Sequence, residues 1–88
     1  MIEKTVKVIN RAGIHARPAS LIVEATIGFK CSIHFEMGSN KINAKSILGV
    51  ITLGAPYKSE IKITADGVDE QEAIDRLTKI FESKFEEE

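Results

Sequence analysis

Cysteine, histidine and long apolar runs are scarce in this sequence, and each scarcity excludes a class of protein. The 88 residues include one cysteine, Cys31, so no intramolecular disulfide can form. Cys31 and the two histidines, His15 and His34, are too few ligands for a Cys/His zinc site. No apolar run approaches the roughly 18 residues of a membrane-spanning helix, and the segment Met1 to Lys4 lacks a signal-peptide stretch. We expect a cytoplasmic protein with no metal, no cofactor and no membrane insertion.

An excess of charge of one sign is also lacking. Lys and Arg number 12 against 13 Asp and Glu, a formal net charge of -1. Non-specific binding to nucleic acid depends on clustered Lys and Arg, and no aromatic pair suited to base stacking stands out on a strand. A domain that binds RNA or a small molecule is therefore a weak alternative. The hydrophobic fraction of 43% and the charged fraction of 28% are typical of one globular domain, here residues 1–88.

Four segments have the pattern of strands. Residues 3–9 are rich in β-branched residues, and residues 31–37 alternate strictly between apolar and polar side chains. The alternation places Cys31 in the core and His34 on the solvent side. Gly38-Ser39-Asn40 is turn material, so residues 41–43 are expected to return as a short hairpin partner. Residues 60–65 alternate again, with Ile61, Ile63 and Ala65 on the inner face.

Three segments have the spacing of helices. The first, over residues 16–27, carries an apolar stripe of Ala19, Ile22, Val23, Thr26 and Ile27, and the second covers residues 47–53. In the third, Asp69 and Glu72 resemble a capping box ahead of a stripe that runs from Ala73 to Phe85. The acidic end, residues 86–88, is expected to be a solvated tail. The order β-α-β-β-α-β-α, with strands polar on one face, predicts an α+β two-layer sandwich with an antiparallel sheet.

One motif lies between the first strand and the first helix, Gly13-Ile14-His15-Ala16-Arg17-Pro18-Ala19-Ser20. Pro18 suits the first turn of a helix, which puts His15 near the N-cap. Histidine is a poor N-cap, because Ser, Thr, Asp or Asn would stabilise the helix by about 1 kcal/mol more. A local rule that is broken at one position suggests function.

The position also explains what that function could be. A helix N-terminus offers unpaired backbone N–H groups, here those of Ala16 and Arg17, and a partial positive charge that binds phosphate. The Arg17 guanidinium adds a cation with a planar fork. Imidazole is a nucleophile, so His15 could attack a phosphoryl donor. The alternative, a solvated loop histidine, accounts for none of the neighbouring residues.

A second motif is Lys45-Ser46-Ile47-Leu48-Gly49-Val50-Ile51-Thr52-Leu53-Gly54. Ser46 precedes the short helix and is a good N-cap candidate, which is its plain structural interpretation. Ile47, Leu48 and Ile51 are too many apolar groups for one face of so short a helix. We expect some of them to be exposed as a docking patch, with a purely structural core role as the alternative.

The two motifs together closely resemble HPr, the histidine-containing phosphocarrier of the bacterial phosphoenolpyruvate-dependent sugar phosphotransferase system. The resemblance covers essentially the whole chain and is closest to the Gram-positive type. It implies an open-faced sandwich, with a four-stranded antiparallel sheet and three helices on one face. It also implies that His15 takes phosphate on Nδ1 from phosphorylated enzyme I and passes it to sugar-specific IIA domains, with Arg17 as phosphate partner. The protein would then be a co-substrate of phosphotransferases, without being an enzyme itself.

The same resemblance implies that Ser46 is phosphorylated by an HPr kinase/phosphorylase, in response to good carbon supply. An alternative is a mainly regulatory adaptor that acts through phospho-Ser46 with a catabolite-control transcription factor. His15 and Arg17 argue against that restricted role. The chain departs from the family pattern at Ala12, where relatives often carry a small polar residue. We expect a monomer, and the sequence leaves dimerisation by exchange of an element open.

Overall fold

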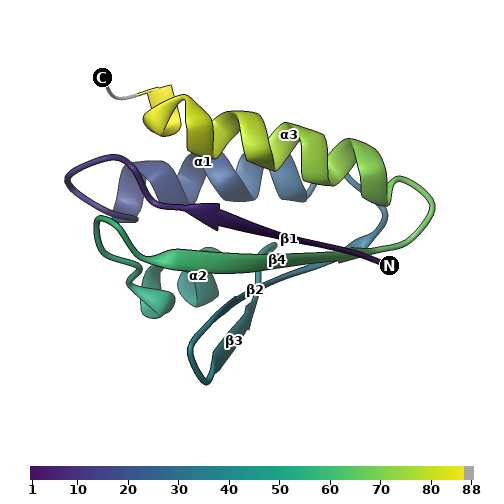
Figure 1. Ribbon diagram of the computed structural model, residues 1–88. Coiled ribbons are helices and arrows are strands. Elements are labelled where there is room, and N and C mark those ends of the chain that lie inside the picture. Colours follow the sequence, from purple (N-terminus) through teal and green to yellow (C-terminus); the bar gives the residue numbers. More distant parts are fainter. Residues whose placement is uncertain (87–88) are drawn as a thin grey trace.

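The secondary structure follows the predicted order β-α-β-β-α-β-α (Figure 1). The computed structural model describes residues 1–86, so Glu87 and Glu88 of the acidic end lie outside the described residues. The strands are β1 (Ile2–Lys7), β2 (Ser32–Met37), β3 (Asn40–Asn43) and β4 (Glu60–Asp66); the helices are α1 (Ala16–Thr26), α2 (Ile47–Leu53) and α3 (Glu70–Glu82), and a 3-10 turn follows at Lys84–Glu86.

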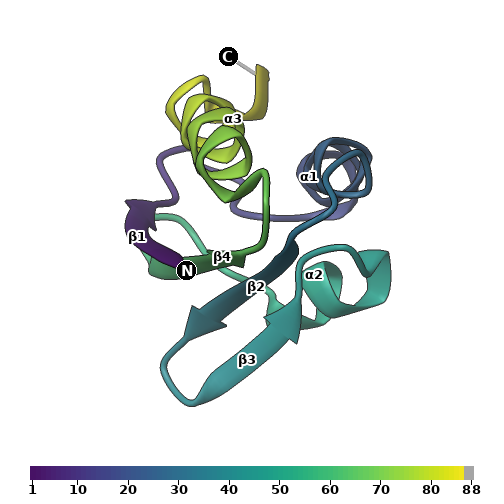
Figure 2. The same cartoon turned by 90° about the vertical axis from the view of Figure 1, so that its right-hand side faces the viewer.

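The four strands form one antiparallel sheet in the order β1-β4-β2-β3. The register sets Phe35 of β2 opposite Ile63 of β4, and Ile33 opposite Ala65. Since successive side chains of a strand point to opposite faces, these apolar residues all lie on one face. The helices cover that face, with α1 and α3 side by side above it and α2 beside β3, as Figure 2 shows. The α+β open-faced sandwich that the sequence predicts is confirmed.

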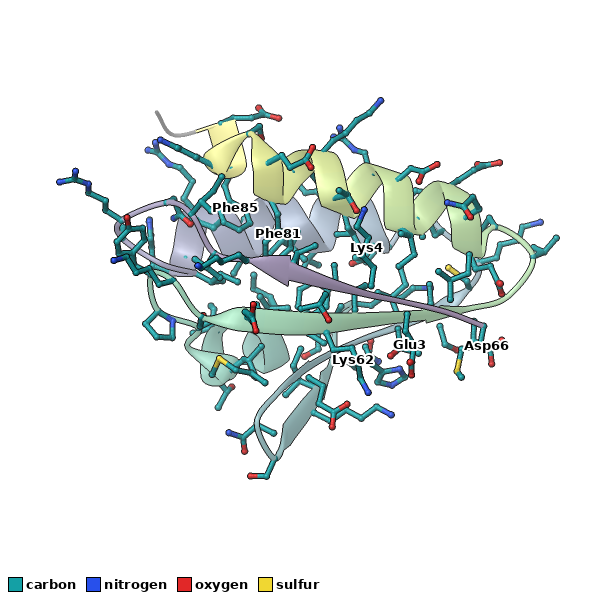
Figure 3. The ribbon with its side chains drawn as sticks, viewed as in Figure 1. Glu3, Lys4, Lys62, Asp66, Phe81 and Phe85 are labelled. Carbon is teal, nitrogen blue, oxygen red and sulfur yellow. The ribbon has the colours of Figure 1, made fainter. Side chains whose placement is uncertain are left out.

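The other face of the sheet is polar and exposed. Lys62 of β4 lies between Glu3 of β1 and Glu36 of β2, with its Nζ 3.8 Å and 3.4 Å from their carboxylate oxygens. Glu3 and Lys62 extend away from α1 and α3 in Figure 3. Exposed ion pairs of this kind each contribute at most about 1 kcal/mol to stability. The stability of the fold therefore depends on the covered face.

Three aromatic rings connect α3 to the sheet. Phe81 of α3 meets Phe35 of β2 edge to face with 5.9 Å between ring centroids, and Phe85 with 4.9 Å (Figure 3 labels Phe81 and Phe85). Phe85 is buried as expected, but α3 ends at Glu82, earlier than the predicted stripe. Lys84 and Phe85 have φ values of 56° and 57°. The helix thus ends in a tight turn, and the Phe85 ring is still buried in the core beside Phe81.

The predicted capping box at the start of α3 is wrong. Asp69 occupies the N-cap, but its side chain makes no capping hydrogen bond. Its carboxylate instead accepts the backbone N–H groups of Lys30, at 2.8 Å, and Cys31, at 2.9 Å. The Glu70 carboxylate accepts the N–H of Gly67 at 3.0 Å and stabilises this turn in place of Glu72. The Asp69 carboxylate therefore binds two backbone N–H groups ahead of β2, far away in the sequence, instead of capping its own helix.

The contact between Asp69 and Cys31 changes the titration of both side chains. The hydrogen bond from the Lys30 N–H, helped by that from Cys31, lowers the pKa of Asp69. Burial and then the neighbouring Asp69 carboxylate raise the pKa of Cys31 to about 11. Cys31 is buried, as the sequence predicts, and precedes β2 rather than beginning it.

Three further predictions need correction. Ile27 is 63% exposed, because α1 ends at Thr26 and Ile27 already turns away from the core. His34 is half-buried instead of solvent-exposed, since β2 is an inner strand and His34 lies between Asn43 and Thr64. The first strand is predicted to reach residue 9, but β1 ends at Lys7. The Val8 N–H donates to the Ser59 carbonyl, and the Val8 carbonyl accepts the N–H of Lys58, a residue with a φ of +75° outside the regular sheet.

Gly67 is expected to be irreplaceable in the turn before α3. Its φ is +153°, and an added Cβ would lie 2.6 Å from the Cα of Cys31. Gly67→Ala should lower the free energy of unfolding by about 2–5 kcal/mol, through backbone strain and overpacking together. Gly38→Ala is the matched control, because Gly38 has a φ of +62° but nothing within 4 Å. It should cost about 1 kcal/mol. Equal losses in urea unfolding would contradict the close contact.

The raised pKa of Cys31 predicts a loss of stability in alkali. Between the usual pKa of 9.0 and about 11, the unfolded thiol loses its proton while the folded thiol keeps it. The unfolded state then binds fewer protons, so stability falls as pH rises, by about 2–3 kcal/mol across the window. Denaturant titrations at pH 8 to 11 should show this decline in the wild type and a shallower one in Cys31→Ala. The same slope in both proteins would refute the assignment.

Candidate functional site

His15 lies at the N-cap of α1, as the motif predicts. Its backbone is extended, with φ of −110° and ψ of −162°, and its side chain makes no capping hydrogen bond to the helix. The carbonyl of His15 accepts the first helical bond, from the Ala19 N–H at 2.9 Å. The side chain is exposed and projects from the surface. An imidazole here can meet a phosphoryl group carried by another protein.

The first turn of α1 is suited to an anion. A helix leaves its first N–H groups without acceptors inside the helix. Pro18 is buried and has no N–H, so those of Ala16 and Arg17 remain for a ligand. The first turn contains no acidic residue that would compete with an anion. The exposed Arg17 side chain lies on this turn and adds a positive charge. The four residues from His15 to Pro18 thus combine a nucleophile, backbone donors and a cation.

The chain reaches His15 through a loop that is fixed from a second segment. Gly13 has a φ of +72°, and an added Cβ would lie 2.8 Å from the carbonyl oxygen of Ala55. The same carbonyl accepts the Ile14 N–H at 2.9 Å. The side chain of Ile14 is buried. The segment that follows α2 thus sets where the active loop lies, a contact that the sequence analysis missed because the two segments are far apart in the chain.

Ser46 is the N-cap of α2, as predicted. Its backbone is extended, and its Oγ accepts the Gly49 N–H at 3.0 Å. The serine is half-buried, and the adjacent Lys45 donates from Nζ to the carbonyl of Phe29 at 2.7 Å. The capping interpretation of Ser46 is therefore correct, and a role in regulation stays a prediction.

The outer face of α2 is apolar and open. Ile47, Leu48 and Ile51 are 40%, 73% and 42% exposed, whereas Val50 and Leu53 are buried in the core. The sequence predicts that some of Ile47, Leu48 and Ile51 are exposed, and the structure exposes all three; their use in docking stays a prediction. The two motifs are linked through the chain itself, since α2 ends two residues before Ala55, the residue whose carbonyl holds the loop of His15.

The candidate site is a surface and not a cleft. A groove does lie between β1 and α3, lined by Lys4, Val6, Ile9, Thr78 and Phe81 among others, but it contains none of the predicted site residues. Within residues 1–86, no three His, Cys, Asp or Glu side chains are grouped so that they could bind a metal. Over the same range, no helix has the length and hydropathy to cross a membrane.

A nucleophilic histidine that is exposed at an anion-binding helix end is typical of proteins that carry a phosphoryl group. Comparison with known proteins agrees. Residues 2–83 match the family model described as PTS HPr component phosphorylation site. The chain is 46% identical to phosphocarrier protein HPr of Treponema pallidum over 88 residues, all of both proteins. It therefore belongs to the HPr family, the phosphocarrier proteins of the phosphotransferase system, which carry a phosphoryl group and are not catalysts.

Solved structures support the same assignment. HPr-C-His from Thermoanaerobacter tengcongensis superposes with a TM-score of 0.96 at 44% identity, covering 100% of this chain and 99% of that one. Crh, the catabolite repression protein of Bacillus subtilis, superposes with a TM-score of 0.76 at 34% identity, covering 96% and 97%. The structure of Crh is described as an intertwined, swapped dimer.

Proposed function

We propose that His15 is the phosphorylated residue of this phosphocarrier. The observation that carries the proposal is the N-cap position of an exposed imidazole, next to the free N–H groups of the first turn and with no carboxylate in that turn. The Nδ1 lone pair attacks the phosphorus on phosphorylated enzyme I. A P–N bond forms on His15 as the bond to enzyme I breaks. The Ala16 and Arg17 N–H groups and the Arg17 guanidinium then stabilise the phosphoryl oxygens.

The second transfer reverses the first. A nucleophile on a sugar-specific IIA domain attacks the same phosphorus, and the P–N bond to His15 breaks. We infer that Ile47, Leu48 and Ile51 provide the apolar centre of the surface that both partners use. Such an interface must be small, because it has to dissociate after each transfer. The chain acts as one HPr domain, a monomer in the cytoplasm, and as co-substrate of the phosphotransferases.

We further propose that Ser46 is a regulatory site, modified by an HPr kinase/phosphorylase. Phosphate at a helix N-terminus is compatible with the fold, since the backbone there favours a negative charge. The added charge of about −1.5 to −2 would lie at the edge of the apolar face of α2 and would repel acidic partners. The similarity to Crh favours a second candidate function, in which phospho-Ser46 engages a catabolite-control transcription factor. His15 and Arg17 argue that such a role would be additional to phosphoryl transfer.

Replacing His15 should abolish the phosphocarrier activity. With phosphoenolpyruvate and enzyme I, the wild type should form an acid-labile phosphate adduct, visible by mass spectrometry. His15→Ala should form none, because the imidazole nitrogen that accepts the phosphoryl group is removed. Arg17→Gln should still be modified, with a transfer rate lower by about tenfold or more, the size expected for losing a charge-assisted hydrogen bond. Ser46→Ala serves as the control that retains the adduct. An undiminished adduct in His15→Ala would refute the proposal.

A negative charge at residue 46 should impair docking while leaving the fold intact. Ser46→Asp keeps an oxygen that can accept the Gly49 N–H, so its stability should stay within about 1 kcal/mol of the wild type. Its KM for transfer from phosphorylated enzyme I should rise several-fold, and the rise should diminish in high salt. Ser46→Asn is the neutral control and should keep the wild-type KM. A KM unaffected by Ser46→Asp would argue against regulation at this surface.

A further inference from the structure

A buried asparagine lies beneath the loop that leads to His15. Asn10 follows the end of β1 by three residues and its side chain is 0% exposed. Burying an amide costs free energy unless hydrogen bonds replace those made to water. An apolar residue would be the simpler choice at this position, so the bonds that Asn10 makes indicate what the amide is for.

The side chain of Asn10 holds the carbonyl group of Gly13. Its Nδ2 donates to the Gly13 oxygen at 2.8 Å, and the Gly13 N–H donates to the Asn10 carbonyl at 3.1 Å. One bond comes from the side chain and the other from the main chain. Together they close the turn over residues 10–13 and fix the direction of the Gly13 carbonyl.

The peptide group after Gly13 is held from both ends. The Gly13 carbonyl and the Ile14 N–H belong to one planar unit. Nδ2 of Asn10 binds its oxygen, and the carbonyl of Ala55 accepts its N–H at 2.9 Å. Rotating this plane would break one bond or both. The Ile14 side chain, 5% exposed, adds a third restraint in the core. His15 is the next residue, so this plane sets where the imidazole begins.

We propose that Asn10 is a positioning residue for phosphoryl transfer, acting on His15 through the Gly13–Ile14 peptide group. The proposal rests on the proposed function of His15, and Asn10 itself does not touch the phosphoryl group. Ala12, in the same loop, offers no polar side chain, and the amide that bonds to the loop comes from the buried Asn10. A displacement of about 1 Å at a reacting group can slow a reaction about a hundredfold. The rate of transfer should therefore depend on Asn10 more than the stability does.

The best substitution removes the donor while keeping the branched shape of the side chain. Asn10→Leu leaves the Gly13 carbonyl without Nδ2, and Asn10→Ala is a second variant in case the first folds poorly. Thr26→Val is the matched control. Thr26 is also 0% exposed, and its Oγ1 donates to the Ala44 carbonyl at 2.8 Å. It lies at the far end of α1, about 16 Å along the helix axis from His15.

The test combines transfer kinetics with NMR spectroscopy of the unphosphorylated protein. In transfer from phosphorylated enzyme I, Asn10→Leu should lower kcat by about 10–100-fold with KM changed less than about twofold. The NMR signals of the His15 ring should shift in the unphosphorylated variant. Thr26→Val should leave the kinetic constants and the ring signals unchanged. The free energies of unfolding of both variants are measured alongside.

Two results would overturn the role of Asn10. One is a kcat for Asn10→Leu or Asn10→Ala within about twofold of the wild type. The other is an equal loss in Thr26→Val, which would mean that lost stability alone slows the transfer. If wild-type His15 accepts no phosphate from enzyme I, the proposed function fails and the ring signals decide about Asn10. A shift in the Asn10 variants alone supports positioning, and unchanged signals overturn it.

Discussion

The hydrogen bond from the Ile14 N–H to the Ala55 carbonyl is the contact on which the candidate site depends. It joins the loop ahead of α1 to the segment behind α2, and the close approach of Gly13 to Ala55 leaves no room for a side chain at Gly13. The start of α1 is placed by this contact, so the direction in which His15 leaves the core follows from it. It is the backbone contact that ties the segment ahead of His15 to the segment behind α2.

The sheet and its helices support the loop of His15 from one side and leave the candidate site exposed. One face of the sheet packs against α3 through Phe35 and Phe81, and the other remains polar. The site is therefore left at the edge of the structure, where α1 begins and α2 presents Ile47, Leu48 and Ile51. A protein that must pass a phosphoryl group between two partners needs such an open site, because a deep pocket would exclude the partner's own reacting group.

The sequence predicted the elements well where periodicity alone decided them. The alternation around Ile33 and Ile61 and the stripe of Ala73 and Leu77 gave correct faces, because period 2 and period 3.6 directly report which side is buried. The errors fall where a distant partner intervened. Asp69 looked like a helix cap, but the unpaired N–H groups of Lys30 and Cys31 take its carboxylate. His34 looked exposed because the sequence predicted only the hairpin partner of its strand, and the pairing with β4 on the other side could not be known beforehand.

By itself, the sequence determined which groups open the first helix: a histidine at the N-cap, an arginine and a proline in the first turn, and no acidic residue beside them. It also determined the second cap at Ser46 and the excess of apolar residues after it. Only the tertiary structure decided how these parts relate. Asn10 and Ala55, which are 45 positions apart in the chain, hold opposite ends of one peptide group ahead of His15. Local sequence patterns cannot predict the bond between Ile14 and Ala55, because it forms only once the sheet has brought the end of β1 beside the start of β4.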